Sequence, residues 1–227
     1  MNNRLSERLG AVYDLVTDGS VVADVGCDHA FLSIALVSDG RAPRAYACDV
    51  NRGPLDKASE NIEAAGLSEK ITIVLSDGLA GLTEPVDSIV ICGMGGPLII
   101  SILQSGLGKA RHAKELILSP QSDAASVRCW LQDNDFSLEE EKAVIDSGKY
   151  YEIIRVVPSQ AAQGWGDGSN FSMKYGPYLL AHRDEVLIAR MKKRIRVIEE
   201  ILEGIDVSSP RYEELKGEEE LCRNFVK

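Results

Sequence analysis

Three aspartates follow the ends of three apolar runs, where their carboxylates could bind the hydroxyl and amino groups of a nucleoside. Asp24 lies in SVVADVG, Asp49 in RAYACDV and Asp77 in KITIVLSD. If these runs are strands of an open α/β sheet, the aspartates meet at its carboxyl edge, where ligands bind. Asp49 follows Gly26 by 23 residues, close to the spacing of about 20 at which a carboxylate binds ribose hydroxyls. With Asp77 as an acceptor for an adenine amino group, the pattern predicts an adenosine-containing ligand.

The turn after the first run carries charge where a dinucleotide-binding turn carries glycine. The G-x-G-x-x-G frame falls on Gly26, Asp28 and Phe31, so two of its three glycines are missing. Asp28 would repel a diphosphate, whereas S-adenosylmethionine has no phosphate and carries a sulfonium and an ammonium. The chain also lacks a G-x-x-x-x-G-K-[ST] motif. The turn therefore favours S-adenosylmethionine as the cofactor over NAD or a nucleoside triphosphate.

The apolar runs that must position these residues alternate with helical patterns, which predicts a parallel sheet. Strand-like runs cover 20–26, 44–50, 70–77, 86–96 and 115–121, and helical patterns cover 31–40, 53–67, 97–106 and 123–136. Two further runs, 138–148 and 149–158, meet at Ser147 and Gly148 with no helix between them, which predicts a hairpin. A parallel sheet that ends in an antiparallel hairpin is the strand plan of class I S-adenosylmethionine methyltransferases. We therefore expect an α/β, Rossmann-like class I fold with a seven-stranded sheet.

The remainder of the chain has a different pattern. Residues 159–171 are rich in Gly, Gln and Ser, as linkers are. Beyond them an apolar seam steps by three and four residues through Ile188, Met191, Ile195, Ile198, Leu202 and Ile205, the spacing of a coiled coil. Ser208, Ser209 and Pro210 then end one helix and begin another. The predicted organisation is a catalytic, cofactor-binding domain over 1–160, a linker over 161–171 and a small coiled-coil-like helical hairpin over 172–227.

The composition limits the class of protein. The chain has 227 residues, of which 44% are hydrophobic, and a net charge of −10, so an RNA substrate would have to meet a local basic patch. The run RMKKRIR is the densest positive stretch, although it is also compatible with a solvated helix face. Five scattered cysteines without a C-x-x-C pair favour a reducing compartment and no metal site. No apolar leader or membrane-length run is present, and we expect a cytoplasmic protein with no obligate protein partner.

Seven motifs occur in the order DVGCDHAFL, CDVNRGPLDKA, SDGL, ICGMGGPLI, RCWL, DSGKYYEI and YGPYLL. Together they resemble the bacterial tRNA (adenine 22-N1)-methyltransferases of the TrmK type, and the resemblance runs from Leu5 to the C-terminal helices. It implies a class I methyltransferase domain, a coiled-coil-like C-terminal domain, and methylation of N1 of adenine 22 in the D-arm of tRNA. The family tends to have Gln-Pro-Asn after the fifth strand. This chain has Ser119, Pro120 and Gln121, which leaves the role of Gln121 open.

The candidate site residues follow from these patterns. Asp28 is the candidate for stabilising charge at the base or accepting a proton from its amino group, with His29 assisting. Asp28 could instead cap a helix or orient the methionine end of the cofactor, and His29 could be structural. The cofactor-binding residues are expected to be Asp24, Gly26, Cys27, Asp28, Asp49, Val50, Asn51, Asp77, Gly78, Gly93, Met94 and Gly95. The substrate-binding residues are expected to be Arg8, Phe31, Gly96, Arg190, Lys192, Lys193, Arg194 and Arg196.

Two other functions remain open on the sequence alone. The chain could methylate a small molecule, with the C-terminal hairpin as a lid or a dimer element. It could also be a catalytically silent module that binds an adenosine ligand, or that binds a protein partner through the hairpin. The fourth strand ends in ICGMGG rather than in the Asn/Asp-Pro-Pro-aromatic motif of amino-directed enzymes, which weakens a case for methylation of an exocyclic amine.

Overall fold

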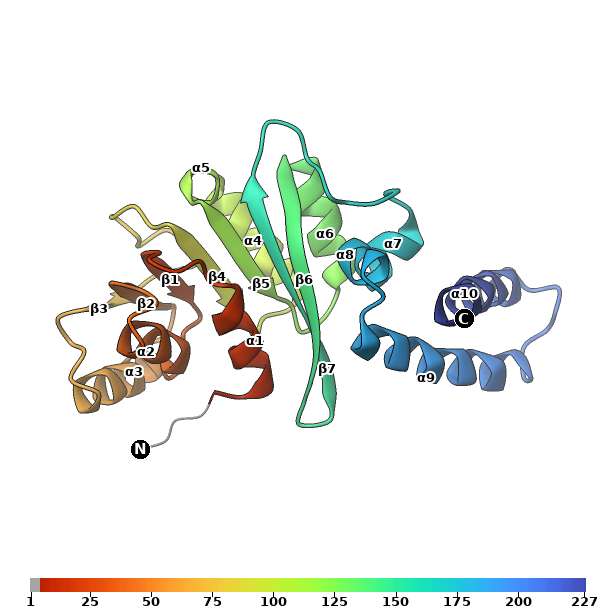
Figure 1. The fold of residues 1–227 in the computed structure, drawn as a ribbon, viewed down its shortest axis with the longest axis horizontal. Helices are drawn as coiled ribbons and strands as arrows, with labels where there is room; N and C mark the ends of the chain where they lie inside the picture. The colour runs from red at the N-terminus through yellow and green to blue at the C-terminus, as the bar shows by residue number, and fades with distance from the viewer. Residues whose placement is uncertain (1–4) are drawn as a thin grey trace.

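The computed structural model describes residues 5–227, which form a seven-stranded sheet flanked by helices (Figure 1). The strand order is β3-β2-β1-β4-β5-β7-β6. The first five strands are parallel, and β7 runs antiparallel to both of its neighbours. The strands are β1 (Val22–Val25), β2 (Ala45–Asp49), β3 (Ile71–Leu75), β4 (Ser88–Cys92), β5 (Glu115–Ser119), β6 (Phe136–Asp146) and β7 (Lys149–Pro158).

Helices cover both faces of the sheet because successive strand residues point to opposite sides. In β4, Ile89 and Ile91 belong to one apolar cluster, whereas Val90 belongs to the other. The first cluster includes α4 (Gly96–Ser105), α5 (Leu107–His112) and α6 (Ala124–Asp133). The second includes α1 (Glu7–Leu15), α2 (Phe31–Ser38) and α3 (Arg52–Ala64). The nearly complete burial of β1, β4 and β5 explains their continuous apolar runs.

The predicted strands and the hairpin are confirmed. Ser147 and Gly148 form the hairpin turn with φ values of 51° and 76°, as a type I′ turn requires. One boundary differs from the prediction: the helix expected to reach Phe136 ends at Asp133, and Phe136 begins β6 instead. Asp135, with a φ of 58°, breaks the helix before that point. The short helix α5 was not predicted from the sequence.

Four helices follow the sheet: α7 (Asn170–Tyr175), α8 (Pro177–Ala181), α9 (Glu185–Leu202) and α10 (Pro210–Val226). The side chain of Ser209 caps α10 by accepting from Tyr212 N, and Pro210 takes the first helical position, where its missing N–H costs nothing. The predicted apolar seam is buried at Met191, Ile195 and Ile198. The helices α9 and α10 therefore form the hairpin expected from the sequence, which extends to one side of the sheet in Figure 1.

The expected linker, residues 161–171, is packed against β6. Trp165 is 3% exposed, and its Nε1 donates to the carbonyl of Phe136 at 2.8 Å. The backbone N–H of Leu138 donates to the carbonyl of Gln163 at 2.8 Å, and α7 already begins at Asn170. The Gly- and Ser-rich composition concealed this packing because one buried aromatic residue suffices to anchor the segment.

A buried ion cluster joins α7 and α8 to the sheet. Arg128 of α6 is fully buried and pairs with Glu141 at 2.6 Å and with Glu152 at 2.7 Å. Its Nη1 also donates to the carbonyl of Met173 in α7 at 2.9 Å. Glu141 in turn accepts from the backbone N–H of Tyr178 in α8 at 3.0 Å. Residues 172–181, which the sequence pattern assigned to the C-terminal hairpin, are thus an integral part of the packing of the sheet. None of the helices within residues 5–227 is long and apolar enough to span a membrane.

Candidate active site

The turn after β1 is held against the carboxyl end of β2. The backbone N–H groups of Gly26 and Cys27 both donate to the carbonyl of Cys48, at 2.8 and 3.0 Å. Gly26 has a φ of +76°, and a Cβ there would meet Met94 Cε at 2.3 Å. Glycine is therefore favoured at this position by its backbone conformation, whereas the flexible end of the Met94 side chain could move aside.

Asp28 faces outward from this turn, and its side chain is 74% exposed. Its φ is +51°, an uncommon conformation for a residue other than glycine. Helix α2 takes Ala30 as its N-cap and has no side-chain cap, so the alternative that Asp28 caps the helix is wrong. The Asp28 carboxylate lies 3.5 Å from His29 Nε2. His29 in turn stacks on the ring of Phe31, with a centroid distance of 5.4 Å, so the three side chains form one exposed group.

Asp24 lies beneath the turn and is buried. Its carboxylate accepts from Ser33 Oγ at 2.9 Å, and burial raises its pKa to about 6. Burial is also the main cause that raises the pKa of the Cys27 thiol, and it raises the pKa values of Cys48 and Cys92 to about 12. No group of residues suited to a metal ion occurs in the described part of the chain.

The turn and the loop after β4 enclose a cavity of about 300 Å³. The structure brings many of the predicted site residues together there, because the ends of β1 and β4 are neighbours in the sheet. Asp49, Val50, Asn51 and Asp77 lie outside its lining, at the ends of β2 and β3. The cavity is lined by Arg8, Leu9, Asp24, Gly26, Cys27, Asp28, His29, Phe31, Leu32, Cys92, Gly93 and Gln121.

Other predicted cofactor-binding residues lie at or after the ends of β2 and β3, where they differ in exposure and contacts. The carboxylate of Asp49 accepts from the backbone N–H of Asn51 at 2.8 Å, which fixes it at the end of β2, and Val50 is 60% exposed. Asp77 is exposed after β3. Gly78 is buried, and a Cβ there would lie 2.9 Å from Ile102, so packing explains this glycine.

The glycines after β4 pack against the loop that follows β5. Gly95 pairs with Ser122, and the backbone N–H of Gly96 donates to the carbonyl of Ser122 at 2.9 Å. A Cβ on Gly96 would lie 2.6 Å from the carbonyl oxygen of Asp123. Gly96, which was predicted to contact substrate, is therefore buried against backbone, and its lack of a side chain is a packing requirement.

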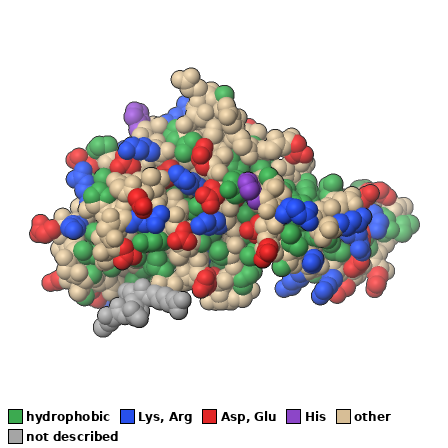
Figure 2. Space-filling model, viewed as in Figure 1, with side chains coloured by type: hydrophobic (Ala, Val, Ile, Leu, Met, Phe, Trp, Pro, Cys, Tyr) green, Lys and Arg blue, Asp and Glu red, His purple; other side chains and the backbone are tan. Residues whose placement is uncertain are grey.

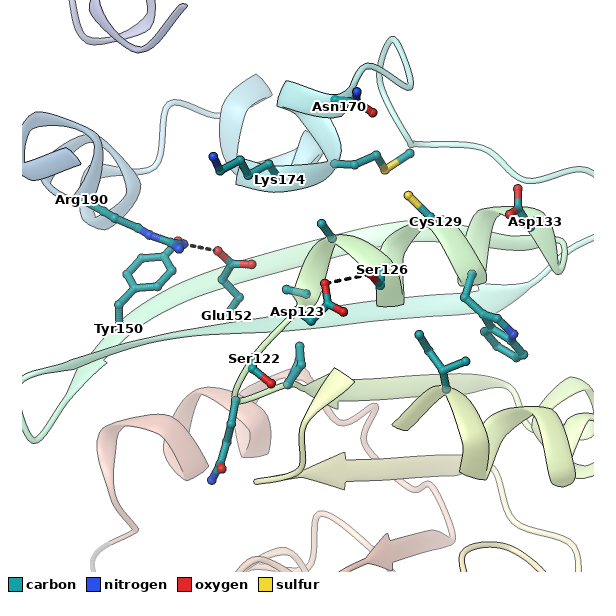
Figure 3. Close-up of a pocket in the computed structure, with 17 residues that line it drawn as sticks. Ser122, Asp123, Ser126, Cys129, Asp133, Tyr150, Glu152, Asn170, Lys174 and Arg190 are labelled. Atoms are coloured by element: carbon teal, nitrogen blue, oxygen red, sulfur yellow. Dashed lines mark hydrogen bonds and ion pairs between the residues drawn. The ribbon is translucent and has the colours of Figure 1, made fainter. Parts of the chain in front are cut away.

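Gln121 is the residue whose place the sequence left open. Its backbone N–H donates to the carbonyl of Met94 at 2.8 Å, so it belongs to the same loop cluster. It lines the cavity and also a groove of about 830 Å³. Figure 3 shows this groove between α6 and the segments that carry Lys174 and Arg190. Gln121 thus borders both the cavity and the groove.

The basic run on α9 divides into two groups. Arg190 pairs with Glu152 at 2.5 Å and stacks on Tyr150, and Arg194 pairs with Glu218 at 2.9 Å. These two arginines therefore serve the packing of the hairpin. Lys192, Lys193 and Arg196 are exposed. Figure 2 shows Lys and Arg side chains gathered over the C-terminal helices, with acidic side chains among them.

The sheet order and the glycine turn against β2 define a Rossmann-like methyltransferase domain. A family model described as a methyltransferase domain matches residues 5–154 of the chain. This agrees with the class of protein that the strand plan predicted.

Comparison with known proteins narrows the class. The chain is 31% identical to the tRNA (adenine(22)-N(1))-methyltransferase of Bacillus subtilis (strain 168). The alignment has 232 positions, gaps included, and covers 98% of this chain and 97% of that protein. The chain belongs to this family of tRNA methyltransferases, which confirms the resemblance seen in its motifs.

Two solved structures with ligands are similar along the whole chain. Sp1610 of Streptococcus pneumoniae in complex with S-adenosyl-L-methionine is 35% identical with a TM-score of 0.87, and the match covers 99% of this chain and 100% of that one. TrmK of M. capricolum in complex with S-adenosyl-homocysteine is 26% identical with a TM-score of 0.84, and the match covers 98% and 97%. The C-terminal hairpin is therefore included in both matches.

Proposed function

We propose that this protein transfers a methyl group from S-adenosylmethionine to N1 of adenine 22 in tRNA. The observation that carries the proposal is the acidic cavity at the ends of β1 and β4, which shares Gln121 with a groove whose lining includes Arg190 of α9. The similarity to a tRNA methyltransferase over 98% of the chain supports the same substrate.

The residues of the site fit S-adenosylmethionine. The turn offers carboxylates rather than a phosphate-binding glycine loop, and Gly26 gives it the positive φ of +76° that the turn needs. Asp24 and Asp28 suit the positive charges of the cofactor, and we expect Asp49 at the end of β2 to accept from ribose hydroxyls. The cofactor supplies an electrophilic methyl group on a cationic sulfonium.

We expect the protein to contribute to catalysis mainly by positioning the adenine base against the methyl group. Adenine N1 carries an in-plane lone pair that attacks a methyl group directly, so orientation of the base accounts for much of the rate. N1 lies on the Watson–Crick edge, so the base has to leave its pair and stack elsewhere. Phe31, 38% exposed and stacked with His29, offers such a surface. The Asp28 carboxylate beside it stabilises the positive charge that develops on the ring, or accepts a proton from the amino group.

The tRNA backbone is expected to contact the C-terminal hairpin. Phosphate contacts by Lys and Arg supply affinity and orientation without reading the sequence, and Lys192, Lys193 and Arg196 are exposed on α9. The rest of the surface belongs to a chain with a net charge of −10, which would repel RNA. Methylation of a small molecule is less well supported, because the exposed Lys192, Lys193 and Arg196 would then have no expected ligand.

The test is methyl transfer from labelled cofactor to a tRNA transcript, with a transcript that has guanine at position 22 as the matched control. Label in the first transcript only, and a primer-extension stop at position 22, would support the proposal, because an N1-methyl group blocks base pairing. Label in a metabolite mixture but not in tRNA would favour the small-molecule alternative. Cofactor binding without any transfer would indicate a silent binding module. Activity of the purified chain alone would support the absence of an obligate protein partner, and the cytoplasmic location stays a prediction.

A further inference from the structure

The side chain of Arg8 reaches from helix α1 into the wall of the cavity. Its two terminal nitrogens stand 3.8 Å from the point where a Cβ on Gly93 would lie, and Gln121 Nε2 stands 3.7 Å from the same point. The guanidinium lies over the ring of Tyr151, 4.9 Å from the centroid. Arg8 thus places a positive charge in a cavity that is otherwise lined by the carboxylates of Asp24 and Asp28.

The β6–β7 hairpin fixes this arginine. The backbone N–H of Arg8 donates to Asp146 Oδ2 at 3.3 Å, next to the hairpin turn. Ser6 caps the same helix by accepting from the backbone N–H of Leu9. Tyr151, which supports the guanidinium, lies in β7. Both the backbone and the side chain of Arg8 are therefore held before any ligand enters.

The Arg8 guanidinium is only partly satisfied by the residues that the structure describes. Within residues 5–227, Arg8 Nε is buried and has no hydrogen-bond acceptor. A buried donor that belongs to a charged group is costly to leave unsatisfied, and the rigid fork of a guanidinium matches a carboxylate or a phosphate. This unmet capacity indicates an anionic group of a ligand.

The carboxylates next to Arg8 indicate which anionic group it binds. A tRNA phosphate would approach Asp24 and Asp28 as well as Arg8, and the two carboxylates would repel it. The amino-acid end of S-adenosylmethionine carries a carboxylate next to an ammonium, so it presents both signs of charge at once. A cavity with an arginine beside aspartates complements such a zwitterion.

We propose that Arg8 binds the α-carboxylate of the cofactor's amino-acid end, while the aspartates of the turn receive its ammonium. The inference rests on the proposed function for the identity of the cofactor. It changes the role expected of Arg8 from substrate binding to cofactor binding, and it makes the β6–β7 hairpin a support of the cofactor site.

The test is calorimetric titration of the full chain with two probes. One is S-adenosylhomocysteine, and the other is its decarboxylated analogue 5′-deoxy-5′-(3-aminopropylthio)adenosine, which keeps the ammonium. Arg8→Ala should weaken binding of the first probe about ten- to hundredfold and change binding of the second by less than about twofold. Arg8→Lys should fall between wild type and Arg8→Ala, because lysine keeps the charge but loses the fork. Arg111→Ala, at an exposed position of α5, is the matched control and should bind both probes as the wild type does.

Equal losses for the two probes would overturn the inference, because the effect would then not depend on the carboxylate. Unchanged affinity for S-adenosylhomocysteine together with weaker tRNA binding would also overturn it and would assign Arg8 to the RNA. Failure of the wild-type chain to bind either probe would overturn the proposed function as well, and so the two failures are distinguishable.

Discussion

Arg190 of α9 donates to Glu152 of β7 at 2.5 Å, across the junction between the sheet and the C-terminal hairpin. Glu152 also pairs with Arg128 at 2.7 Å inside the protein. Burial alone would raise the pKa of Glu152, but the charges of Arg128 and Arg190 hold it below its usual value. Glu152 thus connects α9 to the buried ion cluster formed by Arg128 and Glu141.

The two arginines that pair with Glu152 should differ in their effect on stability. Arg128→Met leaves Glu141 and Glu152 buried without their main partner, and it should lower the free energy of unfolding by about 3–5 kcal/mol. Arg190→Met removes a side chain that is 40% exposed and should cost about 1 kcal/mol or less. Urea denaturation at pH 7 measures both values. Equal losses for the two variants would contradict the role assigned to the buried cluster.

Truncated chains test where the domain that contains the sheet ends. A chain that stops at residue 183 keeps Met173 and Tyr178 on the ion cluster, and it should fold with a cooperative thermal transition. A chain that stops at residue 171 lacks both of these residues and should not show that transition. Circular dichroism melting of the two products provides the comparison. Cooperative melting of the shorter chain would instead support the boundary at 172 that the sequence suggested.

The sheet was predictable because its signals are local. Continuous apolar runs mark strands that are buried on both faces, and the Ser147 and Gly148 pair marks a tight turn within two residues. The strand ends then located Asp24 and the 26–28 turn, since ligands of such sheets bind at one edge.

Other features depend on partners far away in the chain, which a pattern does not reveal. Arg194 belongs to a basic run that suggests a free cation, but its side chain pairs with Glu218, which lies 24 residues further along the chain. Gln121 shares the site because its backbone is bonded to Met94. Gly96 follows the pattern of a ligand-binding glycine but meets the backbone of the loop after β5. Tertiary contacts decide each of these three cases.

Asp24→Asn should show opposite effects on stability and on cofactor binding. The pKa of Asp24 is raised to about 6 in the folded protein, so its contribution to stability is fully present below the unfolded pKa of about 3.9 and is lost as the pH rises through about 6. The variant should therefore unfold with a free energy roughly 1–3 kcal/mol higher at pH 8 and nearly unchanged at pH 4. Denaturation at pH 4, 6 and 8 tests this, and a constant difference across the three values would contradict it.

The affinity of the wild type for S-adenosylmethionine should fall as the pH drops from 7 to 5, because a protonated Asp24 no longer attracts a cation. Asp24→Asn should bind more weakly throughout and lose most of this pH dependence. Calorimetry across this range measures the affinity. A variant that keeps the full pH dependence would show that another group is responsible.

Variants of Asp28 and Asp49 should distinguish an effect on the rate of methylation from an effect on cofactor binding. Asp28→Asn removes the charge beside the expected position of the base and should lower the single-turnover rate by roughly a hundredfold, much more than it lowers cofactor affinity. Asp49→Ala removes the ribose acceptor and should lower cofactor affinity about tenfold or more, with a smaller effect on the rate at saturating cofactor. Rapid-quench methylation and calorimetry measure the two quantities. Equal losses of rate and affinity for Asp28→Asn would place it in the cofactor site instead.

The exposed cations of α9 give the sharpest test of the tRNA path. Lys192 and Lys193 are exposed, whereas Arg190 and Arg194 pair within the protein, so reversal of the two lysines should leave the fold intact. Removing one interaction between a cation and a phosphate flattens the dependence of binding on salt by about 0.9 in log–log slope. The Lys192→Glu, Lys193→Glu variant should therefore bind tRNA more weakly, with a slope shallower by up to about 1.8.

The matched control is Arg44→Glu with Lys70→Glu, which makes the same change in net charge at the amino ends of β2 and β3. This edge of the sheet is opposite to the active site, so the control should keep most of the salt dependence of the wild type. Fluorescence titration of tRNA at several salt concentrations compares the three proteins. Equal slopes for both variants would mean that net charge, rather than the α9 surface, governs tRNA binding. An unchanged slope and affinity for the α9 variant would mean that these lysines form only a solvated helix face. Because Gln121 lines both the cavity and a groove bordered by Arg190 of α9, we expect the α9 variant alone to lose affinity.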